Sequence, residues 1–180
     1  MLKRNIRKRL IKERLLNYKN IKFNLSEIIS IIKKKKFKNP IIGGYYPVNC
    51  EIDCIYILNF LEKKKYNISL PVIGKNNSME FYKYSFKDQL YLNKYGIPEP
   101  KKNKIVYPDF LFVPLVGFDH RLYRLGYGGG YYDRYLNKLG KIKNFTSAGL
   151  AFSFQKINRV PNELFDKRLD MIITSTKTYL

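Results

Sequence analysis

The sequence predicts an α/β protein: a single three-layer α/β/α domain over residues 1–180 with a mostly parallel, Rossmann-like sheet. Three observations predict this class. Stretches with the periodicity of helices and of strands alternate along the chain. Residues 109–115 form an apolar run of strand length, which is typical of a strand buried in a parallel sheet. A length of 180 residues with 45% hydrophobic residues is sufficient for a core of its own.

The first helix is expected over residues 2–17, as a basic amphipathic helix. Its apolar stripe is predicted to comprise Leu2, Ile6, Leu10, Ile11 and Leu15. Lys3 and Arg7 are four residues apart and therefore lie on one face of this helix. A second helix is expected to begin after Ser26 as N-cap and to end in the lysine run at residues 33–36.

The first strand is expected over residues 41–46, interrupted by two glycines. Asn49 is expected to cap the following helix, with Glu51 and Asp53 in its first turn. The apolar face of that helix is predicted from three residues, Ile55, Leu58 and Leu61.

The second half of the chain continues the alternation. Two strands over residues 69–73 and 79–85 are joined by a turn at 74–77. After the strand at 109–115 come a glycine-rich loop and a helix over about 130–139, and then two strands, at 146–152 and 169–174.

The composition excludes two classes of protein. No stretch reaches 18 apolar residues, so we expect no membrane span, and the first twenty residues lack the apolar core of a secretory signal. The two cysteines, Cys50 and Cys54, favour neither a disulfide scaffold nor a zinc site. We therefore expect a cytoplasmic protein whose thiols are buried or partly buried.

The formal net charge of +21 has two interpretations. Lysine and arginine neutralise phosphates in nucleic-acid binders. The alternative is a lysine-rich composition of the kind that AT-rich genomes encode. Because the basic residues are scattered over several helix ends and loops, we favour the second interpretation, with small anionic ligands as a further reason for the charge.

One segment, residues 118–134, carries most of the chemistry. It follows the buried strand, contains the string Arg124-Leu125-Gly126-Tyr127-Gly128-Gly129-Gly130-Tyr131-Tyr132-Asp133-Arg134 and opens a helix. Glycines allow backbone N–H groups to approach an anion closely, and a helix N-terminus favours negative charge. Arg124 can form a fork on phosphate oxygens, and Asp133 is an oxygen ligand of the type that Mg²⁺ prefers beside phosphates. The segment therefore predicts a phosphate-binding loop.

This string, preceded by Val113-Pro114-Leu115-Val116-Gly117-Phe118-Asp119, closely resembles the signature of the 5-formyltetrahydrofolate cyclo-ligase family, also called methenyltetrahydrofolate synthetase. The resemblance covers nearly the whole chain. It includes the basic N-terminal helix, residues 96–100 (Gly-Ile-Pro-Glu-Pro), residues 151–155 (Ala-Phe-Ser-Phe-Gln) and the stretch from 166 to 174.

The resemblance implies an enzyme that uses ATP and Mg²⁺ to close 5-formyltetrahydrofolate into 5,10-methenyltetrahydrofolate. In the reaction that the resemblance implies, ATP phosphorylates the formyl oxygen. Folate N10 then attacks the formyl carbon, and phosphate leaves. The resemblance further implies that ATP is bound by Lys3, Arg7 and residues 124–132, and that Arg7 and Arg124 are also catalytic. It implies that the folate is bound by Tyr46, Glu51 and Tyr132. It implies that the magnesium ligands are Asp133 and Asp166.

The chain departs from the family pattern at two positions. Leu122 stands where glycine is usual, so we expect the loop before Arg124 to bend differently. Phe165 stands where a histidine often precedes the metal-site aspartate, so any contribution of that imidazole is absent.

Besides a monomeric cyclo-ligase, two alternatives remain. The first is a catalytically inactive domain of the same kind that binds RNA through its basic surface. The second is a different ATP-using ligase with another small anionic substrate. Retention of the Arg124–Asp133 string favours the enzyme, because a binding module has no need for that phosphate geometry.

Overall fold

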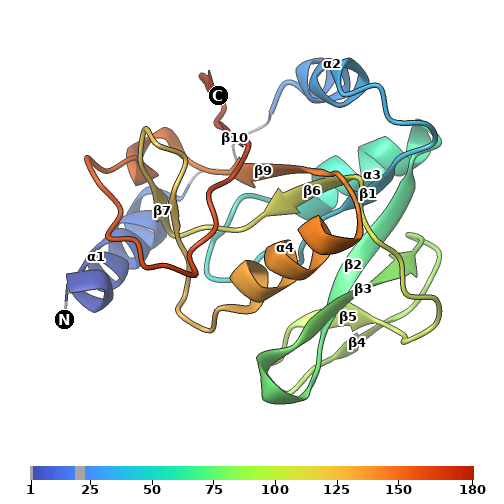
Figure 1. Ribbon diagram of the computed structural model, residues 1–180, viewed down its shortest axis with the longest axis horizontal. Coiled ribbons are helices and arrows are strands. Elements are labelled where there is room, and N and C mark those ends of the chain that lie inside the picture. The colour runs from blue at the N-terminus through green and yellow to red at the C-terminus, as the bar shows by residue number, and fades with distance from the viewer. Residues whose placement is uncertain (1, 19–22) are drawn as a thin grey trace.

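A seven-stranded sheet forms the centre of the computed structural model, which describes residues 2–18 and 23–180 (Figure 1). Its strands lie in the spatial order β11 (Thr178–Tyr179), β10 (Met171–Ile173), β9 (Thr146–Leu150), β6 (Phe110–Val113), β1 (Ile41–Gly43), β2 (Asn67–Ile73) and β3 (Met79–Tyr84). The five inner strands run parallel, and the two edge strands pair antiparallel to them. The predicted α/β class with a mostly parallel sheet is confirmed.

Helices cover both faces of this sheet, which makes the three layers. Figure 1 shows α4 (Tyr131–Ile142) in front of the sheet and α3 (Cys54–Lys63) behind it, with α2 (Leu25–Lys34) at its upper edge. Successive residues of β6 point to opposite faces, as the pleat requires. Phe110 and Phe112 pack with α2 and α3, whereas Leu111 and Val113 pack with α4.

The order of the strands reverses between β1 and β6. From β1 the chain passes through α3 to β2 and β3 on one side, whereas from β6 it passes through α4 to β9, β10 and β11 on the other. Ligands of open α/β sheets bind in the crevice at the carboxyl ends of the strands at such a switch point. The topology therefore predicts a site above the ends of β1 and β6.

Several short elements surround the carboxyl edge of the sheet. Strands β4 (Leu90–Leu92) and β5 (Pro98–Pro100) form one hairpin, and β7 (Gly117–Phe118) and β8 (Arg124–Leu125) form another. Two short 3₁₀ helices complete the fold, η1 (Lys75–Asn77) and η2 (Ser153–Gln155). None of these short strands was predicted, because two or three residues carry no readable periodicity.

The structure corrects both predicted helix caps. Asn24, not Ser26, caps α2, because its side chain accepts hydrogen bonds from the N–H groups of Ser26 and Glu27. Asp53, not Asn49, caps α3 by accepting from the N–H of Tyr56. Glu51 therefore lies before α3 rather than in its first turn, and the apolar face of α3 includes Ile57 as well as the predicted residues.

The structure also corrects the apolar stripe of α1 (Leu2–Asn17), whose bounds agree with the prediction. Leu10 is buried, but Leu2 and Leu15 are more than half exposed. Arg14 is buried in their place, with 1% of its surface exposed. Ile6 and Ile11 are partly buried against the same cluster as Leu10, which confirms that part of the predicted stripe. The inward face of α1 therefore combines apolar residues with the cations Lys3, Arg7 and Arg14.

The remaining predicted bounds hold to within a few residues. The strand expected at 41–46 ends at Gly43, and the helix expected at 130–139 continues to Ile142. We propose that residues 1–180 form one domain, because a single sheet draws its strands from residues 41 to 179. In the described part of the chain, no helix is both long and apolar enough to cross a membrane.

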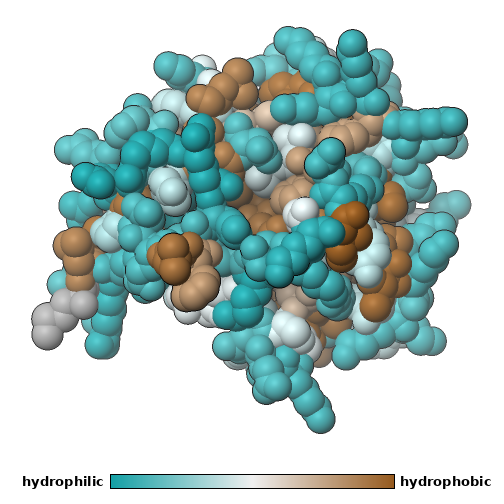
Figure 2. All heavy atoms as spheres, viewed as in Figure 1, coloured by the Kyte–Doolittle hydropathy of each residue, from teal (hydrophilic) through white to brown (hydrophobic). Residues whose placement is uncertain are grey.

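The surface seen in Figure 2 is mostly hydrophilic, and apolar atoms lie on it in separate patches. Lysines of the runs at 33–36 and 63–65 are exposed at the ends of α2 and α3. The basic residues are therefore spread over several elements, although α1 carries seven of them.

Candidate ligand cavity

A cavity of about 1450 Å³ opens at the predicted switch point. Its walls come from the N-terminal half of α1, the segment after β1, the β4–β5 hairpin, the loop between β8 and α4, and residues 163–167. This volume exceeds the roughly 300–1,000 Å³ usual for one small ligand, so two ligands can be accommodated together. Every site residue singled out from the sequence lines this cavity, from Lys3 to Asp166. That includes Tyr46 after β1 and Tyr132 in the first turn of α4.

The glycine-rich loop enters α4 in the conformation that glycine favours. Gly128 and Gly130 have φ of 105° and 66°, in the left-handed region, where a side chain is strained. A Cβ on Gly130 would lie 2.7 Å from the Arg134 guanidinium. The loop and the first turn of α4 line the cavity, and a glycine-rich helix N-terminus is suited to an anion.

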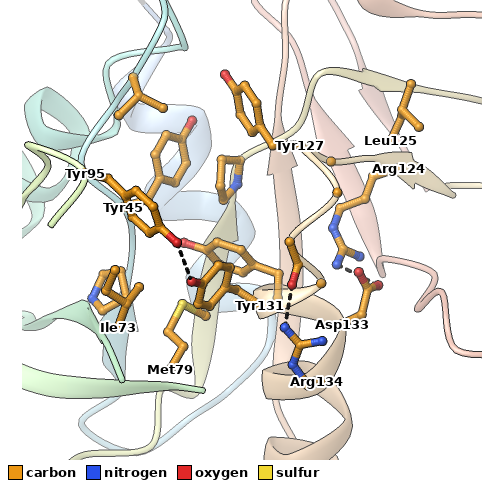
Figure 3. A pocket seen from close by; sticks show the side chains of 18 of the residues that line it. Tyr45, Ile73, Met79, Tyr95, Arg124, Leu125, Tyr127, Tyr131, Asp133 and Arg134 are labelled. Carbon is orange, nitrogen blue, oxygen red and sulfur yellow. Dashed lines mark hydrogen bonds and ion pairs between the residues drawn. The ribbon is translucent and has the colours of Figure 1, made fainter. Parts of the chain in front are cut away.

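Two arginines hold the carbonyl groups of this loop. Arg7 donates from Nε to the Gly126 carbonyl oxygen at 2.7 Å. Arg134, labelled in Figure 3, donates to the carbonyl oxygen of Gly129. It also donates to the carbonyl oxygen of Asn77, which ties the loop to the end of η1. With its carbonyl groups held by cations, the loop is left with its N–H groups for a ligand.

Arg124 is almost fully buried in the wall of the cavity. Its Nη2 donates to Asp133 Oδ1 at 2.8 Å and its Nη1 to the Lys167 carbonyl oxygen at 2.8 Å (Figure 3). The N–H of Lys167 in turn donates to the same Asp133 oxygen at 2.9 Å. Burial lowers the pKa of Arg124, and the Asp133 carboxylate opposes that shift. Arg124 therefore fixes Asp133 and residue 167 relative to each other as well as facing the cavity.

A second ion pair closes the same side of the cavity. Lys3 Nζ lies 2.7 Å from Asp166 Oδ2 and 2.9 Å from Glu163 Oε1. Burial raises the pKa of Asp166, but hydrogen bonds from Lys3 and from the Glu163 N–H outweigh this and hold the pKa below its usual value. Asp166 is thus ionised at neutral pH, as a metal ligand must be.

The carboxylates fit a magnesium ion that arrives with a nucleotide. Asp133 and Asp166 each use only one oxygen in hydrogen bonds to described residues, which leaves the other to face the cavity. Within the described ranges, no group of three or more metal-binding side chains is assembled. Mg²⁺ is usually held by one or two carboxylates together with phosphate oxygens and water, so this donor set suits it.

Glu51 is a buried carboxylate whose acceptor capacity is only partly used. Oε2 accepts from the Val48 N–H at 2.9 Å, but Oε1 has no hydrogen-bond partner among the described residues. The two preceding residues, Asn49 and Cys50, both have left-handed backbones, and this turn directs Glu51 inward. Burial raises the pKa of Glu51 to about 7.

The β4–β5 hairpin reaches the glycine-rich loop through two tyrosines. The hydroxyls of Tyr95 and Tyr131 lie 3.4 Å apart, and Figure 3 shows the two side chains directed toward each other. Sequence reasoning assigned no role to Tyr95, Arg134, Lys167 or Arg14. Tyr95 precedes the Gly-Ile-Pro-Glu-Pro motif and Arg134 ends the glycine-rich string, so a signal for both was present. None existed for Arg14, which looks like one more charge on a basic helix.

The two departures from the family pattern have different outcomes. Leu122 has φ 66°, the left-handed conformation that glycine adopts without strain, while its side chain is buried. The leucine therefore does not prevent the turn before Arg124. Phe165 is 80% exposed at the rim of the cavity, so no imidazole adjoins Asp166 there.

Comparison with known sequences gives a consistent result. The model of the 5-formyltetrahydrofolate cyclo-ligase family matches residues 1–175. A 5-formyltetrahydrofolate cyclo-ligase of Haemophilus influenzae is 34% identical over 145 residues, which cover 77% of this chain and 76% of that protein. A probable 5-formyltetrahydrofolate cyclo-ligase of Schizosaccharomyces pombe is 31% identical over 168 residues, covering 84% of this chain and 81% of that protein.

Solved structures resemble the fold over nearly its full length. The NMR structure of Aquifex aeolicus 5,10-methenyltetrahydrofolate synthetase superimposes with a TM-score of 0.77 and 32% sequence identity, covering 99% of this chain and 92% of that one. The 5,10-methenyltetrahydrofolate synthetase of Mycoplasma pneumoniae gives a TM-score of 0.70 at 24% identity, which bears on the fold alone.

Proposed function

Because the chain belongs to the 5-formyltetrahydrofolate cyclo-ligase family, we propose that it converts 5-formyltetrahydrofolate to 5,10-methenyltetrahydrofolate, with ATP converted to ADP and phosphate. The observation that carries this proposal is that one cavity combines a glycine-rich helix N-terminus with a buried carboxylate. The former suits a triphosphate and the latter a ligand with N–H donors.

On the nucleotide side, the proposal assigns positioning and charge stabilisation to the protein. The N–H groups of residues 128–132 bind phosphate oxygens, while Lys3, Arg7 and Arg124 supply positive charge. Phosphoryl transfer to the formyl oxygen needs such pre-oriented donors far more than it needs acid–base groups. Asp133 and Asp166 would hold a magnesium ion, which would supply further neutralisation of phosphate charge.

On the folate side, Glu51 accepts hydrogen bonds from the pterin head group, and Tyr46 and Tyr132 line the walls beside it. An unpartnered carboxylate oxygen in a buried position is unfavourable unless a ligand donates to it. The folate must then lie with its formyl group toward the glycine-rich loop, where the formyl oxygen receives the phosphoryl group from ATP. Folate N10 then attacks the formyl carbon, N10 loses its proton, and phosphate leaves with the former formyl oxygen.

The experiment that tests the function is a spectroscopic assay with 5-formyltetrahydrofolate and Mg-ATP, which follows the absorbance of the methenyl product. Product must form with ATP and must not form when a non-hydrolysable ATP analogue replaces it. Absence of product together with retention of RNA at physiological salt favours the inactive RNA-binding alternative. ATP hydrolysis without methenyl product in a screen of other anionic substrates indicates a different ligase.

We predict that Glu51→Gln weakens folate use and leaves ATP binding nearly unchanged. Loss of a charge-assisted hydrogen bond costs about 1.5–3 kcal/mol, so kcat/KM for the folate falls about 10- to 150-fold. Glu99→Gln is the matched control, since Glu99 also lines the cavity but its carboxylate holds the β4–β5 hairpin to β2. Normal folate kinetics with a loss of ATP binding would show that the two ligand sites are assigned the wrong way round.

The same substitution is expected to stabilise the protein above neutral pH. The folded pKa of Glu51, about 7, exceeds the unfolded value of about 4.3, so ionisation of this carboxyl group opposes folding. This destabilisation develops as the pH rises from about 4.3 to 7. Thermal unfolding at pH 8 and pH 5 measures it: the gain in Tm from Glu51→Gln must be larger at pH 8.

We predict that Asp133→Asn raises the magnesium concentration needed for half-maximal rate. The amide keeps an oxygen for Arg124 and the Lys167 N–H but loses the charge that a hard cation requires. A magnesium titration of turnover measures the change, with Asp53→Asn as control because asparagine also caps helices well. An unchanged magnesium requirement in Asp133→Asn would remove this residue from the metal site.

The cellular setting is part of the same proposal. Cys50 and Cys54 are free thiols, which suits a reducing cytoplasm. We propose a monomer whose positive charge serves ATP and the folate rather than a polynucleotide.

A further inference from the structure

Arg14 is a buried cation that does not line the cavity. It lies on α1 with 1% of its surface exposed. Nη1 donates to the Leu115 carbonyl oxygen at 3.2 Å and Nη2 to the Tyr127 hydroxyl, while the guanidinium lies 5.7 Å from the centre of the Tyr127 ring. Nε has no partner among the described residues. A guanidinium buried this deeply with only part of its donors used calls for a nearby negative charge.

Glu51 is the buried carboxylate that lines the same cavity as Tyr127. Arg14 and Tyr127 both favour the ionised form of Glu51 and so oppose the effect of burial on its pKa. Oε1 of Glu51 and Nε of Arg14 are both unpartnered in the described part of the chain. Arg14 on α1, Tyr127 in the glycine-rich loop and Glu51 before α3 therefore form one group drawn from three distant parts of the sequence.

We propose that Arg14 is a positioning residue, which holds the Tyr127 hydroxyl and the Glu51 side chain in the orientation in which they meet the folate. The inference rests on the proposed function and adds to it a residue behind the cavity wall. Through Tyr127, Arg14 also connects the folate side of the cavity with the loop that faces the nucleotide.

Within residues 2–18 and 23–180, the charge on Glu51 is supported by one cation, Arg14. The titratable groups that face it from neighbouring segments are Tyr45 after β1, Cys54 on α3, Tyr127, and Tyr132 on α4. All are neutral at physiological pH. Among the described residues, Arg14 is the only cation that acts on the pKa of Glu51. Replacement of Arg14 by a neutral residue must therefore make Glu51 harder to ionise.

The test reads Glu51 directly. Carbon-13 labelling of the seven glutamate carboxyl groups, with Glu51→Gln for assignment, allows an NMR titration without any substrate. In Arg14→Met the pKa of Glu51 must rise by about one unit or more. In Arg14→Lys, which keeps the charge without the fork, the rise must be smaller. Arg9→Met removes an exposed charge from the same helix and must leave the pKa unchanged.

Kinetics supply the second readout. In Arg14→Met, the acid limb of the pH profile of kcat/KM for the folate must move to higher pH by the same amount as the pKa of Glu51. The KM for ATP must change less than the KM for the folate. If Arg14→Met does not fold, Tyr127→Phe, which breaks the contact from the other side, must raise the pKa of Glu51 instead. The inference is overturned if the pKa of Glu51 is the same in every folded variant. Absence of turnover in the wild-type protein overturns the proposed function instead, and the substrate-free titration separates these two failures.

Discussion

Arg124→Ala is expected to lower kcat by about 10²- to 10³-fold, equivalent to roughly 2.7–4 kcal/mol, with a smaller effect on ATP affinity. Arg124 lies in the cavity wall and fixes both Asp133 and residue 167, so its removal takes away a cation and loosens the carboxylate beside it. Donors that are oriented in advance act mainly as charge redistributes on the transferring phosphoryl group, which is why kcat carries the loss. Steady-state turnover of folded, thermally checked variants measures it.

Two further variants sharpen this test. Arg124→Lys must recover only part of the rate, because one ammonium group cannot reproduce the fork that contacts Asp133 and the Lys167 carbonyl together. Arg159→Ala removes an exposed arginine outside the cavity and must keep wild-type turnover. Near wild-type kcat in Arg124→Ala would exclude Arg124 from the catalytic group.

Asp119→Ala is expected to destabilise the protein by about 3–5 kcal/mol, because the fully buried Asp119 carboxylate organises the turn before Arg124. Oδ1 accepts from the N–H groups of Arg121 and Tyr123. Oδ2 accepts from the Arg121 guanidinium and from the Val160 N–H. The same turn contains Leu122 in its left-handed conformation, which the contacts of Asp119 hold in place.

The pH dependence of this effect has a definite sign. Burial raises the pKa of Asp119, but the hydrogen bonds from Val160 and Arg121 outweigh it and hold the pKa below its usual value. The stability that Asp119 contributes is therefore present above the unfolded pKa of about 3.9 and is lost as the pH falls through the folded value. Denaturant unfolding must show a large difference between wild type and Asp119→Ala at pH 7 and a smaller one at pH 3.

The control for Asp119→Ala is Asp88→Ala, which removes an exposed carboxylate that accepts one backbone hydrogen bond. Asp88→Ala must lower the free energy of unfolding much less than Asp119→Ala does. A destabilisation of Asp119→Ala no larger than that of Asp88→Ala would contradict the organising role of this carboxylate.

Much of the fold could be predicted from periodicity and run length, and the failures have identifiable causes. Continuous apolar strands such as residues 110–113 are readable because both faces are buried. The caps were misassigned because several residues near each helix start can accept the hydrogen bond, and only the backbone path chooses between Asn24 and Ser26. At the next helix, the left-handed turn at Asn49 and Cys50 delays the start to Cys54, and nothing in the residue types indicates two such conformations in succession.

The residues of the candidate site could be predicted from the sequence, but the contacts that connect them could not. The structure places every proposed residue in one cavity, although their roles stay predictions. Arg14 was missed because hydrophobic periodicity treats arginine as a surface residue, whereas here three polar contacts make its burial possible. No role could be predicted for Asp119 from the sequence. Its carboxylate accepts from five donors, which belong to backbone and side-chain groups that only the folded turn brings together.

The polar attachment of α1 has a consequence for how the chain folds during its synthesis. Lys3 contacts Asp166, 163 residues later, and Arg7 and Arg14 contact residues more than 100 positions away. At about 5–20 residues per second, some 8–30 s pass between the appearance of Lys3 and that of its partner. During that interval α1 has no docking surface, and a helix with an apolar inward face would be prone to aggregate on the ribosome. Lys3, Arg7 and Arg14 make part of that face polar beside Leu10, and we expect the wall that α1 contributes to the cavity to form only after Asp166 has been synthesised.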